Sequence, residues 1–574
     1  MLFVLKFLVS VIALLATCVL LPQFPLGVLR LVLRSVGLVI RRRTLARREA
    51  ILARARADEE ELLAKQPKVA SASAVSAEDE DWEKVDTSSS GDISGIASQK
   101  SQQPGNEWAG IIGFFHPFCN AGGGGERVLW EAVRATQRRW PKAVCAIYTG
   151  DLDVTKSAML ERVQNRFNIQ LHAPTVELLY LTTRKYVQSS MYPYMTLLGQ
   201  SLGSLIVGYD AFTLLVPDIF VDTMGYAFAV AFSKLLFPSV PTGAYVHYPT
   251  ISTDMLQSLD DKTGLKGANA GAGTGLKGNL KRKYWLAFAR LYGWVGSHVD
   301  VVMCNSSWTS THIRTIWGPS RNNSSPTFQT LKYKNPVVVF PPTAVSDIQS
   351  TIPVTAETES TRTPTILYIA QFRPEKNHPL ILRSFARFLE GHNKNSNNEN
   401  SPHLILIGTV RPSSPDETHI YNLRLLAHEL RLRNNTTFLC DASWPTILSH
   451  LSSASIGVNA MWNEHFGICV VEYQAAGLIA VVHDSGGPRE DIVVDLPESA
   501  TESDVDTKGG RATGFRATTE EEFANAFEKA LSLTPDEKVA MRVRARKSAL
   551  RFTEEEFSKK WVGEVGKLVE MVSC

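Results

Sequence analysis

Short apolar runs alternate with amphipathic segments in two regions of the chain. In the first region, the apolar runs predict strands at 111–115, 143–148, 210–220, 242–247 and 299–304, and a helix is expected over 126–139. In the second region, strands are expected at 365–370, 403–407, 437–439, 456–459 and 480–482. Strands that alternate with helices at this spacing indicate parallel sheets covered by helices. The predicted fold class is therefore α/β, with two Rossmann-like domains that face a cleft.

Proline-rich sequence separates these regions. Pro341-Pro342 and a Thr/Ser/Pro-rich stretch lie between them, so we expect an N-terminal domain over 107–345 and a C-terminal domain over 360–550. Residues 551–574 carry apolar side chains at helical spacing, and we expect this last helix to pack back on the protein.

The N-terminal sequence predicts a membrane anchor. Residues 1–21 contain one charge, Lys6, and would reach ~31 Å as a helix, about the thickness of the hydrocarbon core. A cleaved signal peptide is the alternative, but no small-x-small cleavage site follows. Residues 24–40 favour an interfacial helix, and Arg41–Arg43 favours a cytoplasmic location for the rest of the chain.

Several segments predict irregular structure. We expect a linker over 41–106, basic at first and then of low complexity, and a long loop over 391–401. The glycine-rich stretch 264–278 fits a disordered surface insertion or, less well, a phosphate cradle. The apolar run 192–237 fits either buried helices of the first domain or a surface that dips into a membrane.

Composition excludes several classes of protein. The chain has 574 residues and a net charge of +3, which does not favour a nucleic-acid partner. Its seven cysteines contain no C-x-x-C pair, so neither a disulfide framework nor a structural zinc site is expected. Reduced thiols favour a cytosolic location for most of the chain.

A glycine run is the first candidate ligand site. Gly122-Gly123-Gly124-Gly125 follows the strand expected at 111–115 and opens a helix. Glycines allow close approach of the backbone, and a helix start offers free N–H groups to an anion. The run is neither G-x-G-x-x-G nor a Walker loop, which argues against a dinucleotide dehydrogenase and a Walker-type ATPase. A simple turn is the alternative interpretation of the run.

Two cations follow the first strand of the second region. Arg373 and Lys376 come directly after residues 365–370, at the carboxyl end of a parallel strand, where open sheets bind ligands. Two cations three residues apart suit a diphosphate, and a solvated turn is the alternative.

The strongest local signal is a pair of carboxylates. Glu464 and Glu472 are eight residues apart, and a helix between them would rise ~12 Å and rotate about 80°, so both could face one cleft. Gly467 lies between them and would let backbone amides approach a ligand. Two exposed helix acids are the alternative interpretation.

These motifs together resemble a known family. The E-x7-E segment, Phe372–Asn377 and Gly486-Gly487 resemble the retaining GT-B glycosyltransferases. With Gly122–Val128 and 245–251 added, the chain resembles the eukaryotic α-1,2-mannosyltransferases that act on dolichol-linked oligosaccharides. The resemblance covers about 107–561.

The resemblance implies roles for individual residues. Four residues would be catalytic. Glu464 would contact the mannose, Arg373 and Lys376 would contact the diphosphate, and His247 would lie near the sugar and the acceptor. Glu472 would hold the ribose, with Gly123, Gly124 and Gly125 across the cleft from the diphosphate. Phe466, Gly467 and Ile468 would also contact the donor.

The resemblance further implies the reaction and its setting. GDP-mannose is the implied donor, the linkage is formed with retention, and neither a cofactor nor a metal is expected. The implied acceptor is a dolichol-diphosphate oligosaccharide, Man3GlcNAc2, which gains its fourth and fifth mannoses on the cytosolic face of the endoplasmic reticulum membrane. A single-pass anchor and association with other mannosyltransferases of the pathway are part of this expectation. Another lipid-acceptor enzyme of the same fold with a different nucleotide sugar, or a non-catalytic membrane partner, are the alternatives.

Overall fold

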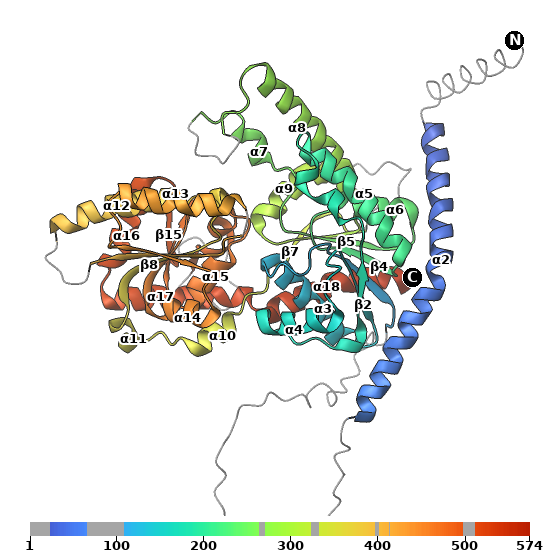
Figure 1. Cartoon of the computed structure of the whole chain (residues 1–574), viewed down its shortest axis with the longest axis horizontal. Helices are drawn as coiled ribbons and strands as arrows, with labels where there is room; N and C mark the ends of the chain where they lie inside the picture. The colour runs from blue at the N-terminus through green and yellow to red at the C-terminus, as the bar shows by residue number, and fades with distance from the viewer. Residues whose placement is uncertain are drawn as a thin grey trace, which may run out of the picture.

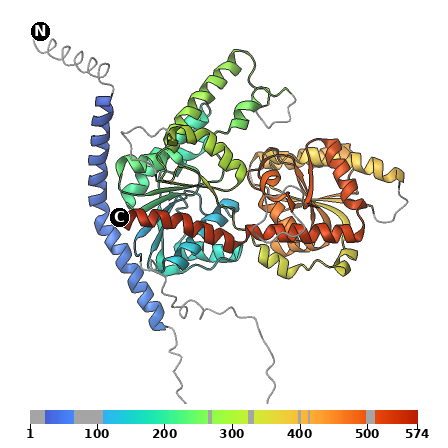
Figure 2. The same cartoon turned by 180° about the vertical axis from the view of Figure 1, so that it is seen from behind.

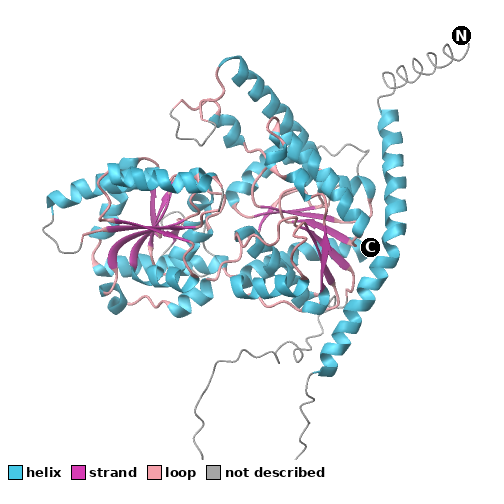
Figure 3. Cartoon of the chain, in the orientation of Figure 1, coloured by secondary structure: helices cyan, strands magenta, loops and turns pink. Residues whose placement is uncertain are grey.

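The computed structural model describes residues 23–65, 108–262, 270–322, 332–395, 401–411, 414–496 and 511–573. Two α/β domains lie side by side, and each has a parallel sheet between layers of helices (Figures 1 and 3). The predicted fold class is confirmed. The expected anchor, residues 1–21, lies outside the described residues, and no described helix is both long and apolar enough to cross a membrane.

The first domain contains a seven-stranded parallel sheet of order β3-β2-β1-β4-β5-β6-β7. The strands β1, β2, β4, β5 and β6 are buried along their whole length, which fits a sheet covered on both faces. The strands are β1 (Ile111–Phe115), β2 (Val144–Thr149), β3 (Val176–Tyr180), β4 (Ile219–Asp222), β5 (Thr242–Val246), β6 (Val301–Cys304) and β7 (Val337–Val338).

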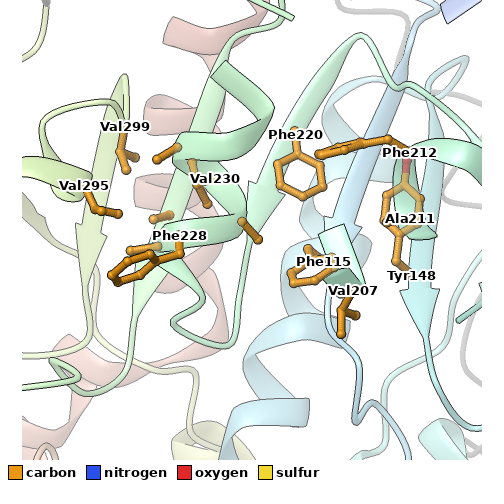
Figure 4. Packing of buried hydrophobic residues seen from close by; sticks show 14 of the residues in the cluster. Phe115, Tyr148, Val207, Ala211, Phe212, Phe220, Phe228, Val230, Val295 and Val299 are labelled. Atoms are coloured by element: carbon orange, nitrogen blue, oxygen red, sulfur yellow. The ribbon is translucent and has the colours of Figure 1, made fainter. Parts of the chain in front are cut away.

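Helices cover both faces of this sheet, and the aromatic core lies beneath them. Phe220 packs 5.6 Å from Phe115 and 5.0 Å from Phe212, measured between ring centroids (Figure 4). The helices are α3 (Gly124–Arg139), α4 (Lys156–Phe167), α5 (Thr196–Leu214), α6 (Ala227–Leu236), α7 (Thr253–Ser258), α8 (Gly275–Gly296) and α9 (Ser307–Asn322).

Two predictions for this domain need correction. The strand expected over 210–220 begins only at Ile219, because residues 210–214 complete helix α5. The glycine-rich stretch 264–278 is only in part an insertion, because α8 begins at Gly275. The apolar run 192–237 contains α5 and the largely buried α6, as the buried-helix interpretation predicts.

The helix α2 (Gln23–Lys65) continues through much of the predicted linker, so the linker prediction is wrong for residues 41–65. Ile40, Ile51 and Ala55 are spaced to form one apolar stripe, and all three are buried. Arg48 pairs with Asp218 at 2.7 Å. The helix therefore runs along the outside of the first domain, over α5 and α6 (Figures 1 and 2).

The second domain has a six-stranded parallel sheet of order β10-β9-β8-β11-β12-β15. Its main strands are β8 (Thr363–Ile369), β9 (His403–Gly408), β10 (Thr436–Cys440), β11 (Ala454–Asn459), β12 (Ile479–His483) and β15 (Gly514–Ala517), and β13 (Asp495–Leu496) pairs with β14 (Arg511–Ala512). The helices are α10 (Val345–Thr351), α11 (Ala356–Ser360), α12 (His378–Asn395), α13 (Pro415–Glu429), α14 (Trp444–Ser453), α15 (Ile468–Ala475), α16 (Glu520–Ser532) and α17 (Pro535–Ala549). Because α12 extends to Asn395, the loop expected over 391–401 is shorter than predicted.

The last helix, α18 (Glu554–Ser573), returns to the first domain and packs on α3 (Figure 2). The Trp561 ring stacks 6.1 Å from the ring of Phe114 in β1 and lies 6.4 Å from that of Tyr245 in β5. The expectation that this helix packs back is therefore confirmed, and the two domains are joined by chain that crosses between them twice.

Candidate active site

The candidate site in the second domain lies where the strand order reverses. The chain leaves β8 toward β9 and β10, then returns to pair β11 on the other side of β8. Ligands of open α/β sheets bind in the crevice at the carboxyl ends of such strands. Lys376 follows β8 and Glu464 follows β11, so adjacent strands bring together two side chains that are 88 residues apart.

These two side chains form an ion pair. The Lys376 Nζ lies 2.5 Å from the Glu464 Oε2, and both side chains are less than one-fifth exposed. Burial alone would lower the pKa of Lys376 and raise that of Glu464. The mutual attraction outweighs burial, so the pKa of Lys376 is raised and that of Glu464 is lowered. Both groups are therefore charged at neutral pH.

Arg373 lies on the same turn as Lys376 but faces a different carboxylate. Its Nε is 3.9 Å from the Asp416 Oδ2 of α13, and the side chain is 28% exposed. Arg411 binds the same carboxylate more closely, at 2.7 Å. The Arg373 guanidinium is thus held loosely at the strand end, where its donors can reach a ligand.

The two glutamates do not share a helix as predicted. Helix α15 begins at Ile468, and its N-cap, Gly467, has a φ of +103°. Glu464 therefore lies in the loop before the helix and only Glu472 lies on it. Because Gly467 has a positive φ, the helix cannot extend back through it to Glu464. The assumption that the segment between the two glutamates is largely helical overlooks this.

Gly486 and Gly487 support the loop that carries Glu464. The Gly487 amide donates to the Glu464 carbonyl at 2.8 Å. Gly486 has a φ of +67°, and a Cβ there would lie 2.3 Å from the same carbonyl oxygen. The close approach of these two backbones requires glycine.

Glu472 is a half-buried carboxylate on α15. Burial raises its pKa to about 7, and Arg127 of α3 is the cation that opposes this shift. Among the described residues, no side chain or backbone group donates a hydrogen bond that stabilises this carboxylate. A carboxyl in this state accepts readily from hydroxyl donors.

The glycine run of the first domain faces this helix. A Cβ at Gly124 would lie 2.7 Å from the Ile468 Cδ1, and one at Gly125 would lie 3.9 Å from the His247 ring. The start of α3, the start of α15 and His247 therefore meet across the cleft. Two helix N-termini that converge in this way favour an anion between them.

His247 follows β5 and is neutral. Burial lowers its pKa to about 4, and its Nε2 lies 3.0 Å from the Thr223 carbonyl. Because a carbonyl only accepts, we assign the proton to Nε2, which leaves Nδ1 as an acceptor for a hydroxyl.

Sequence reasoning missed His116, which follows β1 directly. It is fully buried, its Nδ1 lies 2.8 Å from the Thr223 Oγ1, and burial together with His247 lowers its pKa to about 3. A polar residue at the carboxyl end of a wholly apolar strand is the signal that could have revealed it.

Polar and aromatic contacts join the Glu464 loop to the first domain. Asn463 donates to the Asp254 Oδ2 of α7 at 2.6 Å, so the loop that carries Glu464 is tied to the first domain. The His465 ring packs 4.1 Å from Tyr248 and 5.5 Å from Trp308, between ring centroids. Sequence reasoning did not identify Asp254, Tyr248 or Trp308.

Phe466 is a core residue and not a side-chain ligand. Its ring is 3% exposed and packs 5.8 Å from Phe340 and 5.4 Å from Phe552. The buried side chain fixes the loop between Glu464 and Gly467, and the expected contact between the donor and the backbone amides near Phe466 stays a prediction.

Most of the chain matches known protein families. Residues 109–317 match the family described as ALG11 mannosyltransferase N-terminus, and residues 355–548 match glycosyl transferases group 1. The sucrose-phosphate synthase of Thermosynechococcus elongatus has the same fold, with a TM-score of 0.52 at 14% identity over 80% of this chain and 98% of that one.

Two relatives are similar over most of their length. The GDP-Man:Man(3)GlcNAc(2)-PP-Dol alpha-1,2-mannosyltransferase of Neurospora crassa is 54% identical, over 94% of this chain and 93% of the relative. The human protein of the same name is 41% identical, over 80% of this chain and 87% of the relative. The chain therefore belongs to the family of GDP-Man:Man(3)GlcNAc(2)-PP-Dol alpha-1,2-mannosyltransferases.

Proposed function

We propose that the chain transfers mannose from GDP-mannose, in α-1,2 linkage, to a dolichol-diphosphate-linked Man3GlcNAc2, and so adds the fourth and fifth mannoses. Its relatives are named for this activity. The observation that carries the proposal is the Lys376–Glu464 ion pair at the strand ends, on the loop before α15, whose first residue, Ile468, lies against Gly124 of α3. A cation, an acid and two helix N-termini at one place suit a sugar diphosphate.

The cationic groups act on the leaving group. As the bond between the mannose C1 and the diphosphate oxygen breaks, its electron pair passes to the diphosphate. Lys376, Arg373 and the free amides at the start of α15 stabilise that negative charge. These groups supply the charge neutralisation, and we propose that the reaction requires no metal or cofactor.

The carboxylates hold the donor at two points. Glu464 accepts hydrogen bonds from mannose hydroxyls, and Glu472 accepts from the ribose. The acceptor hydroxyl attacks C1 on the face that the diphosphate leaves, and its proton passes to the departing phosphate oxygen, so the α configuration is retained. Neither glutamate serves as a nucleophile in this scheme. The Nδ1 of His247 accepts from a sugar hydroxyl and positions it.

The setting is the cytosolic face of the endoplasmic reticulum membrane, with residues 1–21 as a single-pass anchor. Helix α2 follows that segment in the sequence and packs on the first domain, where Arg48 pairs with Asp218. The basic residues Arg41–Arg43 support the cytosolic orientation. Protease added to sealed microsomes should digest the chain beyond residue 50, and full protection would contradict this orientation.

One assay tests the activity. Purified full-length chain, labelled GDP-mannose and a trimannosyl chitobiosyl diphosphate lipid should give a product two mannoses longer, which α-1,2-mannosidase shortens again. A panel of UDP-sugars serves as the control. Transfer from a UDP-sugar and none from GDP-mannose would favour the alternative lipid-acceptor enzyme. Association with other mannosyltransferases stays a prediction, which affinity purification from membranes tests.

A further inference from the structure

Helix α8 has an apolar face that no other element in the described part of the chain covers. It projects from the first domain (Figure 1), and its other face packs on α6 and α9 through Trp285 and Phe288. Four large apolar residues lie along the projecting face: Leu276 (88% exposed), Leu280 (70%), Leu291 (36%) and Trp294 (45%). Their spacing places them on one side of the helix. Single exposed apolar residues are common, but an aligned set of four marks an interaction surface.

The charges beside this stripe identify its partner. Helix α8 contains no Asp or Glu, and Lys277, Lys283 and Arg290 are exposed along it. An apolar face with flanking cations and a tryptophan is typical of a helix that lies in the interface of a membrane with anionic lipids. A protein partner would need a matching acidic rim, whereas a bilayer supplies both the apolar layer and the negative charge.

The location of α8 agrees with such a role. The outer end of α8 and the N-terminal end of α2 extend toward the same end of the molecule, the top in Figures 1 and 2. The apolar residues 1–21 precede α2 in the sequence. A bilayer that held residues 1–21 would therefore lie on the side toward which α8 projects.

Helix α8 is also connected to the cleft. The Tyr292 hydroxyl of α8 accepts from the Thr250 amide at 3.4 Å, in the segment that joins His247 to α7. Asp254 of α7 in turn binds Asn463, next to Glu464. These contacts fix the position of α8, and of a membrane bound to it, relative to His247 and Glu464.

We propose that the Leu276–Trp294 face of α8 inserts into the interface of an anionic bilayer and holds the cleft at the height of a lipid-linked diphosphate. This inference depends on the proposed function only for the identity of the acceptor, a lipid-linked diphosphate. The lipid contact itself is independent of which sugar is transferred.

Site-specific photocrosslinking tests the contact in the full-length chain. Benzoylphenylalanine at position 280, in chain reconstituted into vesicles of phosphatidylcholine and phosphatidylinositol, should form an adduct with lipid. The matched control is the same group at position 421, because Tyr421 is 67% exposed but lies on α13 of the second domain. Equal adducts at both positions, no lipid adduct at 280, or crosslinks from 280 to a second protein chain would overturn the proposal.

Activity gives a second readout. In the variant L276S/L280S, kcat/KM for a bilayer-embedded acceptor should fall by roughly tenfold to a hundredfold, since each leucine loses apolar burial. For a short-chain acceptor in detergent the variant should stay within about twofold of the unmodified chain. Equal losses on both acceptors would refute the membrane role. If the unmodified chain transfers no mannose to either acceptor, the proposed function fails, while the crosslinking result still decides the lipid contact.

Discussion

Replacing Lys376 with methionine separates the catalytic role of the ion pair from its structural role. Methionine keeps much of the length of the side chain but leaves the Glu464 carboxylate unpaired. At the 2.5 Å separation of Nζ and Oε2, the gross attraction at an effective dielectric of 20 is about 7 kcal/mol, and much of it offsets desolvation. The net effect on stability is therefore smaller, and it depends on pH.

Proton uptake limits the cost of the stranded carboxylate. Since the ordinary pKa of a glutamate side chain is 4.5, the penalty of an unpaired Glu464 cannot exceed about 3 kcal/mol at pH 7 or about 1 kcal/mol at pH 5, because the group takes up a proton instead. In the unmodified chain the lowered pKa of Glu464 contributes stability above about pH 4.5, which is lost as the pH falls. Both effects increase the difference in unfolding free energy between the unmodified chain and Lys376→Met as the pH rises. Urea unfolding of both proteins at pH 5 and pH 7 measures this difference.

Turnover should fall by about 10² to 10³ in Lys376→Met, since a group that stabilises the leaving diphosphate is lost. The double variant K376M/E464Q is the matched control. It carries no stranded charge, so the unfolding free energy at pH 7 should recover while turnover stays low. Turnover within threefold of the unmodified chain in K376M, or recovery of activity in the double variant, would refute the reasoning.

The same geometry supports three further predictions. Glu472→Gln should raise the unfolding free energy by up to about 3 kcal/mol at pH 8 and little at pH 5, because burial raises the pKa of Glu472 to about 7 and its ionised form is costly. The same variant should raise KM for GDP-mannose with little change in kcat, and a pH-independent change in stability would contradict the assignment. Gly486→Ala should lower the unfolding free energy by about 1–3 kcal/mol and lower turnover at least tenfold, because it displaces Glu464. Gly563→Ala, in open space on α18, is the matched control and should leave stability unchanged or raised. Thermal melts and rate assays of both variants measure these effects. Trp561→Ala should lower the unfolding free energy by about 3–5 kcal/mol in urea titrations, and a loss below 1 kcal/mol would show that α18 contributes little to the first domain.

The sequence predicts the strands that carry the site because parallel strands are buried on both faces and read as apolar runs. The strand at 365–370 thus predicts that Arg373 and Lys376 lie at the site, whereas the role of His247 after β5 is implied by the family resemblance. The strand β3 (Val176–Tyr180) was missed, and residues 210–214 were assigned to a strand although they end α5. A short apolar run does not distinguish a strand from the last turn of a buried helix.

Pairing across the fold could not be predicted. The contact between Lys376 and Glu464 depends on β11 lying next to β8. The local pattern of apolar and polar residues does not predict the order of strands in a sheet. The link between Asp254 and Asn463 spans 209 residues and both domains. The helix over 41–65 was missed for another reason. Its basic and acidic composition suggested a linker, although Ile40, Ile51 and Ala55 already had helical spacing.

The position of Phe466 shows how the loop of the site is joined to the crossings between the domains. The chain passes from the first domain to the second after Phe340 and returns after Phe552, and the Thr343 amide donates to the Phe552 carbonyl at 3.0 Å. The rings of Phe340 and Phe552 lie 4.9 Å apart, and both pack on Phe466. Because both crossings meet at these rings, a rotation of one domain against the other pivots beside them. The loop that carries Glu464 is anchored at that pivot by Phe466 and tied to the first domain by Asn463. A change in the angle between the domains must therefore alter the position of Glu464 relative to His247, and the buried side chain of Phe466 is what connects that loop to the pivot.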